Sequence, residues 1–355
     1  MNKGIKLSVV IVNYNGREYA DKCIASVFAS KTKNLEVIVV DNYSSDNSVK
    51  ELTQRYSCYG RNFQVIGLDQ NYGPAKARNV GVKAARGEII AFLDNDTLVD
   101  EFWAEAAIKE FSASAEVGAI QCKLLLSKER NKIDYVGEYL GQNGFLVQRA
   151  RAGSTDTGKF NKRCEILAAK SAGMFIRKKV FEQAGGFDDD YFIYVEETDL
   201  GWRSWLSGYK VVYVPSSIVY HEFGTSSVIL GKVKNNYNAK FHGCKNYILT
   251  LFKNLDSISL LKILPIHIVL WLGLAWYALL KRDAKSFFWI HKAVWWNVSN
   301  LRTSLYKRKI IQKNRKINDD DLFEIVMREK PLSYFIKKAV IPHKVGNAEG
   351  FIKKT

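Results

Sequence analysis

Four short apolar runs in the first hundred residues alternate with amphipathic helical patterns, and most of the runs end in polar turn residues. The apolar runs are 7–12, 35–40, 63–66 and 88–93. The helical patterns place Tyr19, Cys23, Ile24, Val27 and Phe28 on one face, continue from Val49 to Leu52, and recur from Pro74 to about Ala85. Strands that alternate with helices form right-handed βαβ units. The pattern therefore predicts an α/β fold with a mostly parallel central sheet.

The fourth run ends in Asp94-Asn95-Asp96, two carboxylates spaced by one residue. Open α/β sheets bind their ligands beyond the carboxyl ends of the strands, so these side chains are expected at a ligand site. Paired carboxylates suit a hard divalent cation that is shared with the phosphates of a substrate. An acidic turn after a strand is also common, and the pair alone does not distinguish the two interpretations.

Residues 115–225 have a mixed pattern. It predicts strands at 118–122, 173–176 and 211–214, the last closed by Pro215, a turn at 185–188, and a helix over 196–206. Glu196 and Glu197 fall in the first turn of this helix, where the helix dipole favours acids. The segment 137–160 is rich in Gly, Arg, Ser and Thr, and it is expected to form a mobile surface loop near the site.

The 355 residues carry a net charge of +17, which points to nucleic acid, an anionic membrane surface or a phosphorylated substrate as partner. The basic excess lies mostly in the tail and no nucleic-acid-binding module is present, so nucleic acid is disfavoured. The five cysteines contain no C-x-x-C pair, which argues against a zinc site or a disulfide scaffold. The first residues lack the apolar core of a signal peptide, so a cytoplasmic location is expected.

The composition becomes strongly apolar and aromatic after residue 240. The segment 263–280 has 18 residues, the lower limit for a membrane-spanning helix, but it contains Pro265 and His267. Residues 281–355 carry 18 Lys and Arg against 7 Asp and Glu, and one span would put this basic tail outside, against the positive-inside trend. A helix lying in an anionic membrane interface fits better. The alternative is a helical subdomain packed on the core of the α/β part of the chain.

Taken in order, the motifs resemble those of family 2 glycosyltransferases of GT-A fold, and the chain is most similar to bacterial rhamnosyltransferase-type enzymes of surface polysaccharide assembly. The matching segments are 9–16, 37–46, 70–73, 77–81, 94–96, 185–188 and 196–200, followed by His221. The resemblance covers about residues 6–225, and more loosely 226–320. It implies a GT-A catalytic domain over 1–230, with a nucleotide-sugar half (1–100) and an acceptor half (101–230). A basic, aromatic-rich helical region that associates with the membrane would follow over 231–355.

The resemblance also implies roles for single residues in the nucleotide-sugar site. Asp41 would accept a hydrogen bond from a pyrimidine N3–H, Tyr14 would pack on the base, and Arg78 would offer a bidentate fork to phosphate. Asn71 and Gly73 would form a tight loop that lets the backbone approach the nucleotide. The expected set is Asn13, Tyr14, Asn15, Asp41, Asn71, Gly73, Arg78, Asp94 and Asn95. A turn or helix-capping role for Asp41 and a solvated helix-face charge for Arg78 are the structural alternatives.

For the metal, the resemblance implies Mg²⁺ or Mn²⁺ with Asp96 as main ligand, Asp94 binding through water or ribose, and His221 as third ligand. Inversion at the anomeric carbon needs one base, and the family places an Asp where this chain has Glu197. Glu197 is therefore the expected base, with Glu196 as the alternative. The i, i+4 pair Asp199 and Arg203 is expected to be structural. Lys245-Asn246 replaces the Arg-Asn of related enzymes, so an acceptor phosphate or the membrane interface is expected nearby.

These expectations describe an inverting, metal-dependent transferase on the inner face of the plasma membrane. It would move a hexose, with rhamnose as one candidate, from a UDP- or dTDP-sugar to a lipid-linked saccharide. Polyprenyl phosphate or a protein is the alternative acceptor, and a basic nucleic-acid-binding protein is the alternative outside enzymes. A Rossmann dehydrogenase is disfavoured because no G-x-G-x-x-G follows the first strand. A glycosidase would have no use for the D-x-D metal site.

Overall fold

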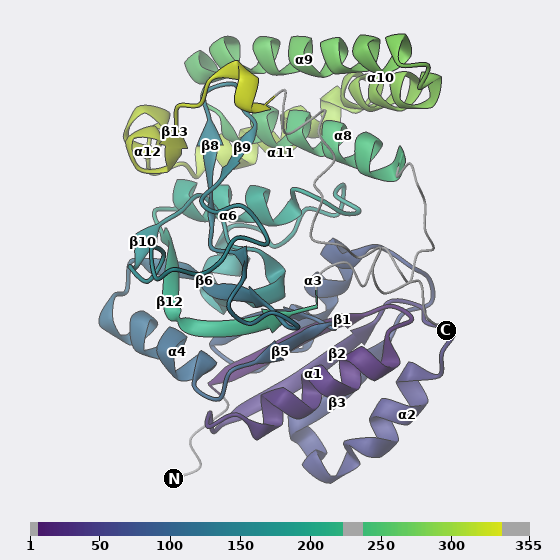
Figure 1. Ribbon diagram of the computed structural model, residues 1–355, viewed down its shortest axis with the longest axis vertical. Helices are drawn as coiled ribbons and strands as arrows, with labels where there is room; N and C mark the ends of the chain where they lie inside the picture. Colours follow the sequence, from purple (N-terminus) through teal and green to yellow (C-terminus); the bar gives the residue numbers. More distant parts are fainter. Residues whose placement is uncertain (1–5, 223–236, 336–355) are drawn as a thin grey trace.

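The computed structural model describes residues 6–222 and 237–335, and it stacks a sheet-containing half against a layer of helices (Figure 1). The first half contains β1 (Leu7–Asn13), α1 (Arg17–Ala29), β2 (Leu35–Asp41), α2 (Ser48–Arg55), η1 (Ser57–Asn62), β3 (Phe63–Gly67), α3 (Pro74–Ala84), β4 (Ile89–Asp94), β5 (Thr97–Val99) and α4 (Trp103–Ala113). Then come β6 (Val117–Leu126), β7 (Ile133–Tyr135), β8 (Glu138–Gly141), β9 (Leu146–Gln148), β10 (Cys164–Glu165), η2 (Ser171–Gly173), β11 (Met174–Arg177), α5 (Lys178–Gln183), α6 (Glu196–Leu206) and β12 (Lys210–His221). The last part contains α8 (Tyr237–Asn254), α9 (Ser257–Leu280), α10 (Ala284–Ser299), α11 (Leu301–Lys313), α12 (Asp319–Val326) and β13 (Met327–Arg328).

The first four strands form the parallel part of the main sheet, in the order β4-β1-β2-β3. Their bounds confirm the strands predicted from the apolar runs to within one or two residues. The register sets Asn13 beside Asp41, and Val12 beside Asp94, so the polar residues that end β1, β2 and β4 share one edge of the sheet. This is the edge at which open α/β sheets bind ligands.

The rest of the main sheet is mixed, because β11 runs antiparallel to both of its neighbours, β4 and β6. β12 then pairs parallel to β6. The prediction that the last strand closes at Pro215 is wrong, since β12 continues to His221. Its register shifts between Val214 and Ile218, and a proline is tolerated at such an irregularity because its missing N–H leaves no ladder bond unmade.

The alternating side chains of β1 divide the core between the two faces of the sheet. Val9 and Ile11 pack with α1 and α4, while Val10 packs with residues of α3, α5 and α6. The second of these clusters continues into the hairpin β8–β9 and the helical layer. The α/β half and the helical layer therefore share the apolar core on this face of the sheet.

The segment 137–160 is only partly the surface loop that its composition predicts. Residues 149–160 form no helix or named strand, and all of them are half-buried or exposed. Residues 138–148 instead form the hairpin β8–β9, which pairs with β13 in a second, three-stranded sheet. The carbonyl of Asn143, in the hairpin turn, lies 3.0 Å from Nδ1 of His267 on α9, and Trp271 donates to the other ring nitrogen. Long-range pairing with a strand and a helix that come more than 100 residues later along the chain explains why local composition predicted a loop here.

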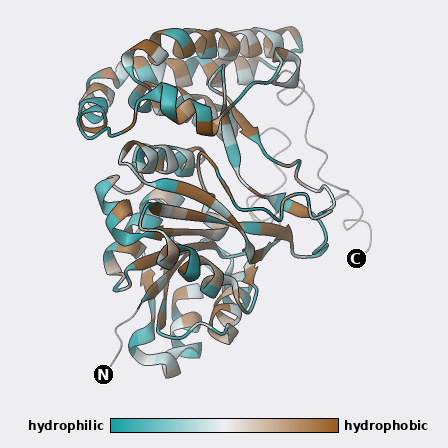
Figure 2. Cartoon of the chain, turned by 90° about the vertical axis from the view of Figure 1, so that its left-hand side faces the viewer, coloured by the Kyte–Doolittle hydropathy of each residue, from teal (hydrophilic) through white to brown (hydrophobic). Residues whose placement is uncertain are grey.

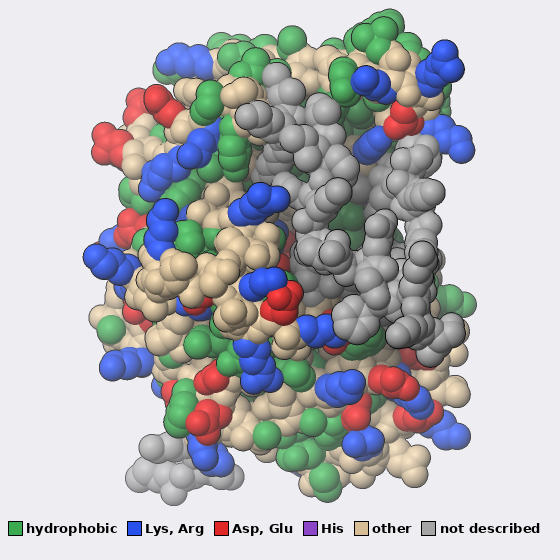
Figure 3. Space-filling model, in the orientation of Figure 1, with side chains coloured by type: hydrophobic (Ala, Val, Ile, Leu, Met, Phe, Trp, Pro, Cys, Tyr) green, Lys and Arg blue, Asp and Glu red, His purple; other side chains and the backbone are tan. Residues whose placement is uncertain are grey.

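Helix α9 is, in the described part of the chain, the one helix long and apolar enough to cross a membrane. One stripe of it is buried against the hairpin and α8: Ser259, Ile263, His267, Trp271 and Ala275. Burial lowers the pKa of His267 to about 4, so this histidine is neutral at physiological pH. The other faces of α9 and α10 are apolar and exposed at the end of the molecule (Figures 2 and 3). The domain boundary expected at residue 230 lies outside the described residues and stays a prediction.

Candidate active site

A buried amide, Asn13, links the ends of three neighbouring strands. Its Nδ2 donates to Oδ2 of Asp41 on β2 at 2.9 Å, and its Oδ1 accepts from Asn95 after β4 at 2.8 Å. The backbone N–H of Ser44 donates to the other carboxylate oxygen of Asp41 at 2.8 Å. A carboxylate oxygen can accept two hydrogen bonds, so each oxygen of Asp41 retains a lone pair for a ligand donor. Three of the predicted nucleotide-site residues, Asn13, Asp41 and Asn95, are thus brought together.

The loops around this network order further predicted residues. Asn15, with φ of 50°, donates its N–H to Ser44, and its side chain accepts from the N–H of Ser45. Asn71 accepts from Asn42 and from the N–H of Gly73, each at 2.9 Å. Tyr14 directly precedes Asn15 in the chain and is half-buried.

Gly73 has a structural requirement that the sequence did not reveal. A Cβ on this residue, whose φ is 80°, would come 2.4 Å from the carbonyl oxygen of Phe192. Glycine is therefore required by the close approach of the segment before α6, in addition to its left-handed backbone. The predicted role of Gly73 beside the nucleotide stays a prediction.

Asp94, Asp96 and His221 come together at the sheet edge. The short strand β5 follows the D-x-D and pairs antiparallel with the end of β12, so that Thr97 lies beside His221. The N–H of Glu222 also donates to the carbonyl of Asp96 at 2.9 Å. Ligand atoms of Asp94, Asp96 and His221 all lie within 4.8 Å of one another, which brings the three predicted metal residues into one cluster.

The chemistry of this cluster fits a divalent cation. Nε2 of His221 lies 3.3 Å from Asp96, while Nδ1 lies 2.8 Å from the carboxylate of Asp134 on β7. A carboxylate on the far ring nitrogen is the usual partner of a metal-binding histidine, because it fixes the tautomer and the ring orientation. Burial lowers the pKa of His221, but the hydrogen bonds and charges of Asp134 and Asp96 outweigh it and raise that pKa well above its usual value.

Arg78 on α3 is not the solvated helix-face charge considered as the alternative, and its phosphate-binding role stays a prediction. It is buried, with Nη1 2.9 Å from Glu196 and Nη2 3.2 Å from Asp94. Burial lowers the pKa of Arg78, but the surrounding carboxylates, Asp94 first, raise it above its ordinary value. The guanidinium is therefore a fixed positive charge between the D-x-D and α6, and it is not a solvated helix-face residue.

The two glutamates at the start of α6 differ in access. The side chain of Glu196 is 4% exposed and its Oε2 has no hydrogen-bond partner among the described residues, whereas Glu197 is 18% exposed. Burial, with the charge of Glu197 added, raises the pKa of Glu196 to about 7, although Arg78 opposes the shift. Oε1 of Glu197 accepts from the N–H of Ser171 at 2.9 Å and from its hydroxyl. The carboxylate of Glu197 is thereby oriented at the edge of the cluster.

The i, i+4 pair on α6 is structural, in agreement with the prediction. Asp199 is fully buried, lies 2.7 Å from Arg203, and also accepts from Lys253 and Asn254 of α8. Lys245 is buried too, and its ammonium donates to the carbonyl of Asp190. Burial lowers the pKa of Lys245 to about 8. This lysine is thus engaged inside the protein, and it does not lie free for an acceptor phosphate.

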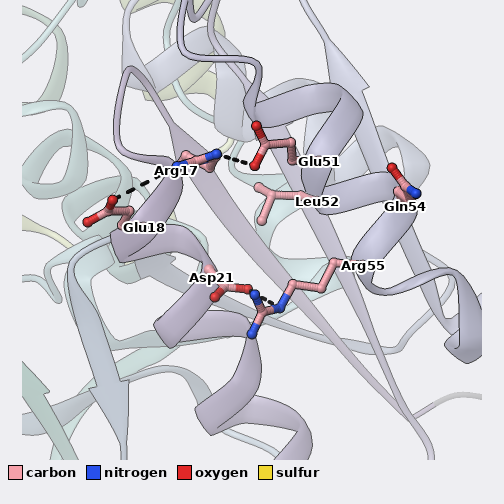
Figure 4. A pocket seen from close by; sticks show the side chains of 7 residues that line it. All are labelled: Arg17, Glu18, Asp21, Glu51, Leu52, Gln54 and Arg55. Atoms are coloured by element: carbon pink, nitrogen blue, oxygen red, sulfur yellow. Dashed lines mark hydrogen bonds and ion pairs between the residues drawn. The ribbon is translucent and has the colours of Figure 1, made fainter.

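Sequence reasoning missed Asp134 and Ser171, which orient His221 and Glu197. Neither lies in a motif of the resemblance, and only the fold brings Asp134 beside a residue 87 positions away. A separate open hollow between α1 and α2 contains none of the site residues (Figure 4). Its charged side chains are largely paired with one another, Arg17 with Glu51 and Arg55 with Asp21.

Comparisons with known proteins agree with this geometry. The model of glycosyl transferase family 2 matches residues 8–185. Glycosyltransferase AglE of Haloferax volcanii is 27% identical over 61% of this chain and 66% of its own length. The O-antigen biosynthesis protein RfbC of Myxococcus xanthus is 27% identical over 60% of this chain, which spans only 17% of that protein.

The fold comparison extends over nearly the whole chain. The crystal structure of GalNAc-T7 with UDP, GalNAc and Mn²⁺ superposes with a TM-score of 0.61 at 15% identity, covering 95% of this chain and 58% of that one. This similarity confirms the predicted α/β fold of GT-A type. The family match covers half of the chain, from β1 to just beyond α5. The chain therefore belongs to glycosyl transferase family 2 and is a glycosyltransferase of GT-A fold.

Proposed function

We propose that this glycosyltransferase is an inverting, metal-dependent enzyme that moves a hexose from a UDP- or dTDP-sugar to a lipid-linked saccharide in cell-surface polysaccharide synthesis. The observation that carries the proposal is the cluster of Asp94, Asp96 and His221, backed by Asp134 and placed beside Glu197. The name of the Myxococcus relative, an O-antigen biosynthesis protein, supports the polysaccharide class. The GalNAc-T7 crystal structure contains UDP and Mn²⁺, which supports the donor and cofactor class.

The site residues divide into a donor end and a reaction end. Asp41 and its partner Asn13 would hold the pyrimidine, and the D-x-D side chains would face the ribose and diphosphate. Mg²⁺ or Mn²⁺ held by Asp94, Asp96 and His221 would neutralise the charge that develops on the leaving diphosphate. Arg78, fixed between Asp94 and Glu196, would hold these carboxylates at a set distance from the base.

Glu197 is our choice for the base that takes the proton from the acceptor hydroxyl. The pKa and the exposure of the two glutamates favour different residues. The raised pKa of Glu196 is nearer to the ideal value for a base at neutral pH. A base must reach the hydroxyl, however, and Glu196 is enclosed and paired with Arg78. Glu197 has the greater exposure, and Ser171 holds its carboxylate in one orientation.

The acceptor and location are proposed from the helical layer. The outward faces of α9 and α10 expose large apolar side chains, among them Leu261 at 77%, Leu280 at 81% and Trp295 at 67%. Basic residues accompany them on the same two helices and the turn between: Lys262, Lys281, Arg282, Lys285 and Lys292. An apolar, aromatic face beside lysines and arginines suits the surface of an anionic membrane. A lipid-linked acceptor at the inner face of the plasma membrane fits this arrangement, and polyprenyl phosphate is the alternative acceptor.

Thermal unfolding tests the donor and metal parts of the proposal. Mn²⁺ with UDP or dTDP should raise the unfolding temperature, since a ligand at 100 times its Kd adds roughly 2.7 kcal/mol to the free energy of unfolding. The shift should require both metal and nucleotide, and it should disappear in Asp96→Ala. GDP serves as the control nucleotide. If Mn²⁺ shifts the unfolding temperature with GDP but not with UDP or dTDP, the proposal of a pyrimidine-nucleotide donor is wrong. If no nucleotide shifts the unfolding temperature, the proposal of a metal-dependent mechanism is wrong.

A further inference from the structure

Two residues immediately before α6 have left-handed backbone conformations. Tyr194 has φ of 71° and Val195 has φ of 69°, and Val195 is the residue at which α6 begins its first hydrogen-bonded turn. Positive φ is unfavourable for any residue with a Cβ, and most of all for a β-branched one. Such a conformation persists only where the surrounding structure holds it. Its location next to Glu196 and Glu197 makes the contacts that hold it relevant to the reaction.

One buried side chain of α8 holds this segment. Nδ2 of Asn246 donates to the carbonyl of Ile193 at 2.9 Å and to that of Tyr194 at 2.7 Å. The opposite orientation of the amide would set its oxygen against two carbonyl oxygens, so the hydrogen-bond network fixes the assignment. Asn246 is fully buried, and the neighbouring Lys245 donates to the carbonyl of Asp190 in the same segment.

We propose that Asn246 is a positioning residue for the reaction, because it holds Tyr194 and Val195 in the conformation that sets the start of α6 and hence the direction of Glu197. The proposal rests on the proposed role of Glu197 as base. Glu197 is then fixed from two sides, since its carboxylate accepts from Ser171 while its backbone follows from Val195. The helical layer thereby contributes to the geometry of a site whose other groups all lie in the catalytic half.

Asn246 is separable from the contacts that hold the helical layer in place. Lys253 and Asn254, two turns further along α8, bind the side chain of Asp199 in the first turn of α6. The hydrogen bonds of the Asn246 side chain go only to the segment before α6 among the described residues. Removing its amide should therefore release this segment while α8 stays docked.

The first experiment compares Asn246→Ala and the isosteric Asn246→Asp with wild type. Both variants lose the two donors, and we expect kcat to fall roughly 10- to 100-fold, the effect of misplacing a reacting group by about 1 Å. The KM for the donor sugar and the thermal shift with Mn²⁺ and nucleotide should stay near wild type, because neither depends on Glu197. The matched control is Gln312→Ala. This amide also donates to backbone carbonyls of α8 and the turn after it, but it does not contact the segment before α6.

The second experiment adds Val195→Gly to Asn246→Ala. Glycine adopts positive φ without the steric cost of a Cβ, so the double variant should recover most of the lost kcat. If Asn246 contributed only to overall stability, the effects of Asn246→Ala and Val195→Gly on kcat would add, and the double variant would not recover activity. Unchanged kcat in Asn246→Ala, or failure of Val195→Gly to restore any of a lost kcat, would overturn the proposal.

Amide hydrogen exchange gives a readout that does not need turnover. The N–H of Asp199 bonds to the carbonyl of Val195 at 2.9 Å, so this amide should exchange faster in Asn246→Ala and slower again in the double variant. If wild type transfers no sugar from any UDP- or dTDP-donor, the proposed function fails while the exchange result still tests the positioning role. Equal exchange in wild type and Asn246→Ala would overturn the positioning role alone.

Discussion

Two clusters of charged side chains, mostly buried or half-buried, both include residues of α6, and they differ in their balance of charge. The cluster at the sheet edge sets five carboxylates against one guanidinium and one imidazole: Asp94, Asp96, Asp134, Glu196, Glu197, Arg78 and His221. The cluster at the junction with the helical layer sets three carboxylates against four cations: Asp188, Asp190, Asp199, Arg203, Lys245, Lys253 and Lys307.

This difference indicates that the cluster at the sheet edge is a functional site and that the cluster at the junction is structural. Buried charges are costly unless they are paired, so the junction cluster, which contains enough cations for its carboxylates, needs no further ion and is a structural joint. A surplus of carboxylates requires a further cation, which at the sheet edge is supplied by a divalent metal in the function proposed here. Residues of the same types therefore serve different purposes, and the balance of charge around them distinguishes the purposes.

The largest expected effect is on turnover at the sheet edge. Asp96→Asn should lower transfer by at least roughly 1000-fold, because the charge of the leaving group is no longer neutralised. The thermal stability of the metal-free protein should stay equal or rise, since one of the crowded carboxylates is removed. Sugar-transfer assays and thermal unfolding without metal measure the two quantities. The control is Asp21→Asn, which breaks the surface pair of Asp21 with Arg55 and should change neither sugar transfer nor metal-free stability. A large loss of metal-free stability in Asp96→Asn would contradict the proposed difference between the two clusters.

At the junction the same type of substitution should act on stability. Asp199→Asn leaves Lys253 and Arg203 without a buried counter-charge and should lower the free energy of unfolding by about 3–5 kcal/mol. Denaturant unfolding gives this value. Glu110→Gln, which breaks a surface pair with Arg163, should cost less than about 1 kcal/mol. Similar costs for the two variants would mean that the junction does not hold the layers together.

The two clusters should also respond to pH with opposite sign. Burial raises the pKa of Glu196 from 4.5 to about 7, so its contribution is full below pH about 4.5 and is lost as pH rises through 7. Burial opposes ionisation of Asp188 as well, but Lys253 and Lys307 outweigh it and hold the pKa of Asp188 below its usual 3.8. Its contribution is therefore present above that value and is lost on acidification. Metal-free unfolding across pH 3–8 should show both slopes.

Variants identify the groups responsible for these slopes. Glu196→Gln should flatten the fall in stability between about pH 4.5 and 7, and Asp188→Asn should flatten the acid limb. If Glu196→Gln leaves the fall in stability between about pH 4.5 and 7 unchanged, another group is responsible for that fall. It would also remove the argument that the sheet edge is short of positive charge.

The smallest effect concerns the outward face of the helical layer. Trp276→Ala and Trp295→Ala remove aromatic rings that are more than half exposed, and each should weaken sedimentation with anionic vesicles by roughly tenfold. Donor binding should not change. Phe102→Ala, a similarly exposed aromatic residue of the catalytic half, is the control. Equal loss of vesicle binding in the control would locate the membrane contact elsewhere.

The first half of the molecule could be predicted well because its contacts are regular. The strands β1 to β4 are continuous apolar runs, which parallel sheets buried on both faces require. Their ends meet at one edge, so the order of strands and helices is enough to place Asp41, Asp94 and Asp96 together. His221 was predicted only through the motif order of the family, since nothing local marks a histidine as a ligand.

The sequence by itself determined the family, the βαβ order and the carboxylates of the site, because these depend on periodicity and on motifs within a few residues. The tertiary structure decided the rest through long-range contacts. It turned the segment around β8 and β9 into a hairpin held by α9, carried β12 past Pro215 to His221, and buried Arg78 between Asp94 and Glu196. It also set Asn246 against the segment before α6. These contacts join residues that are far apart in the chain, and no local pattern encodes which of them will meet.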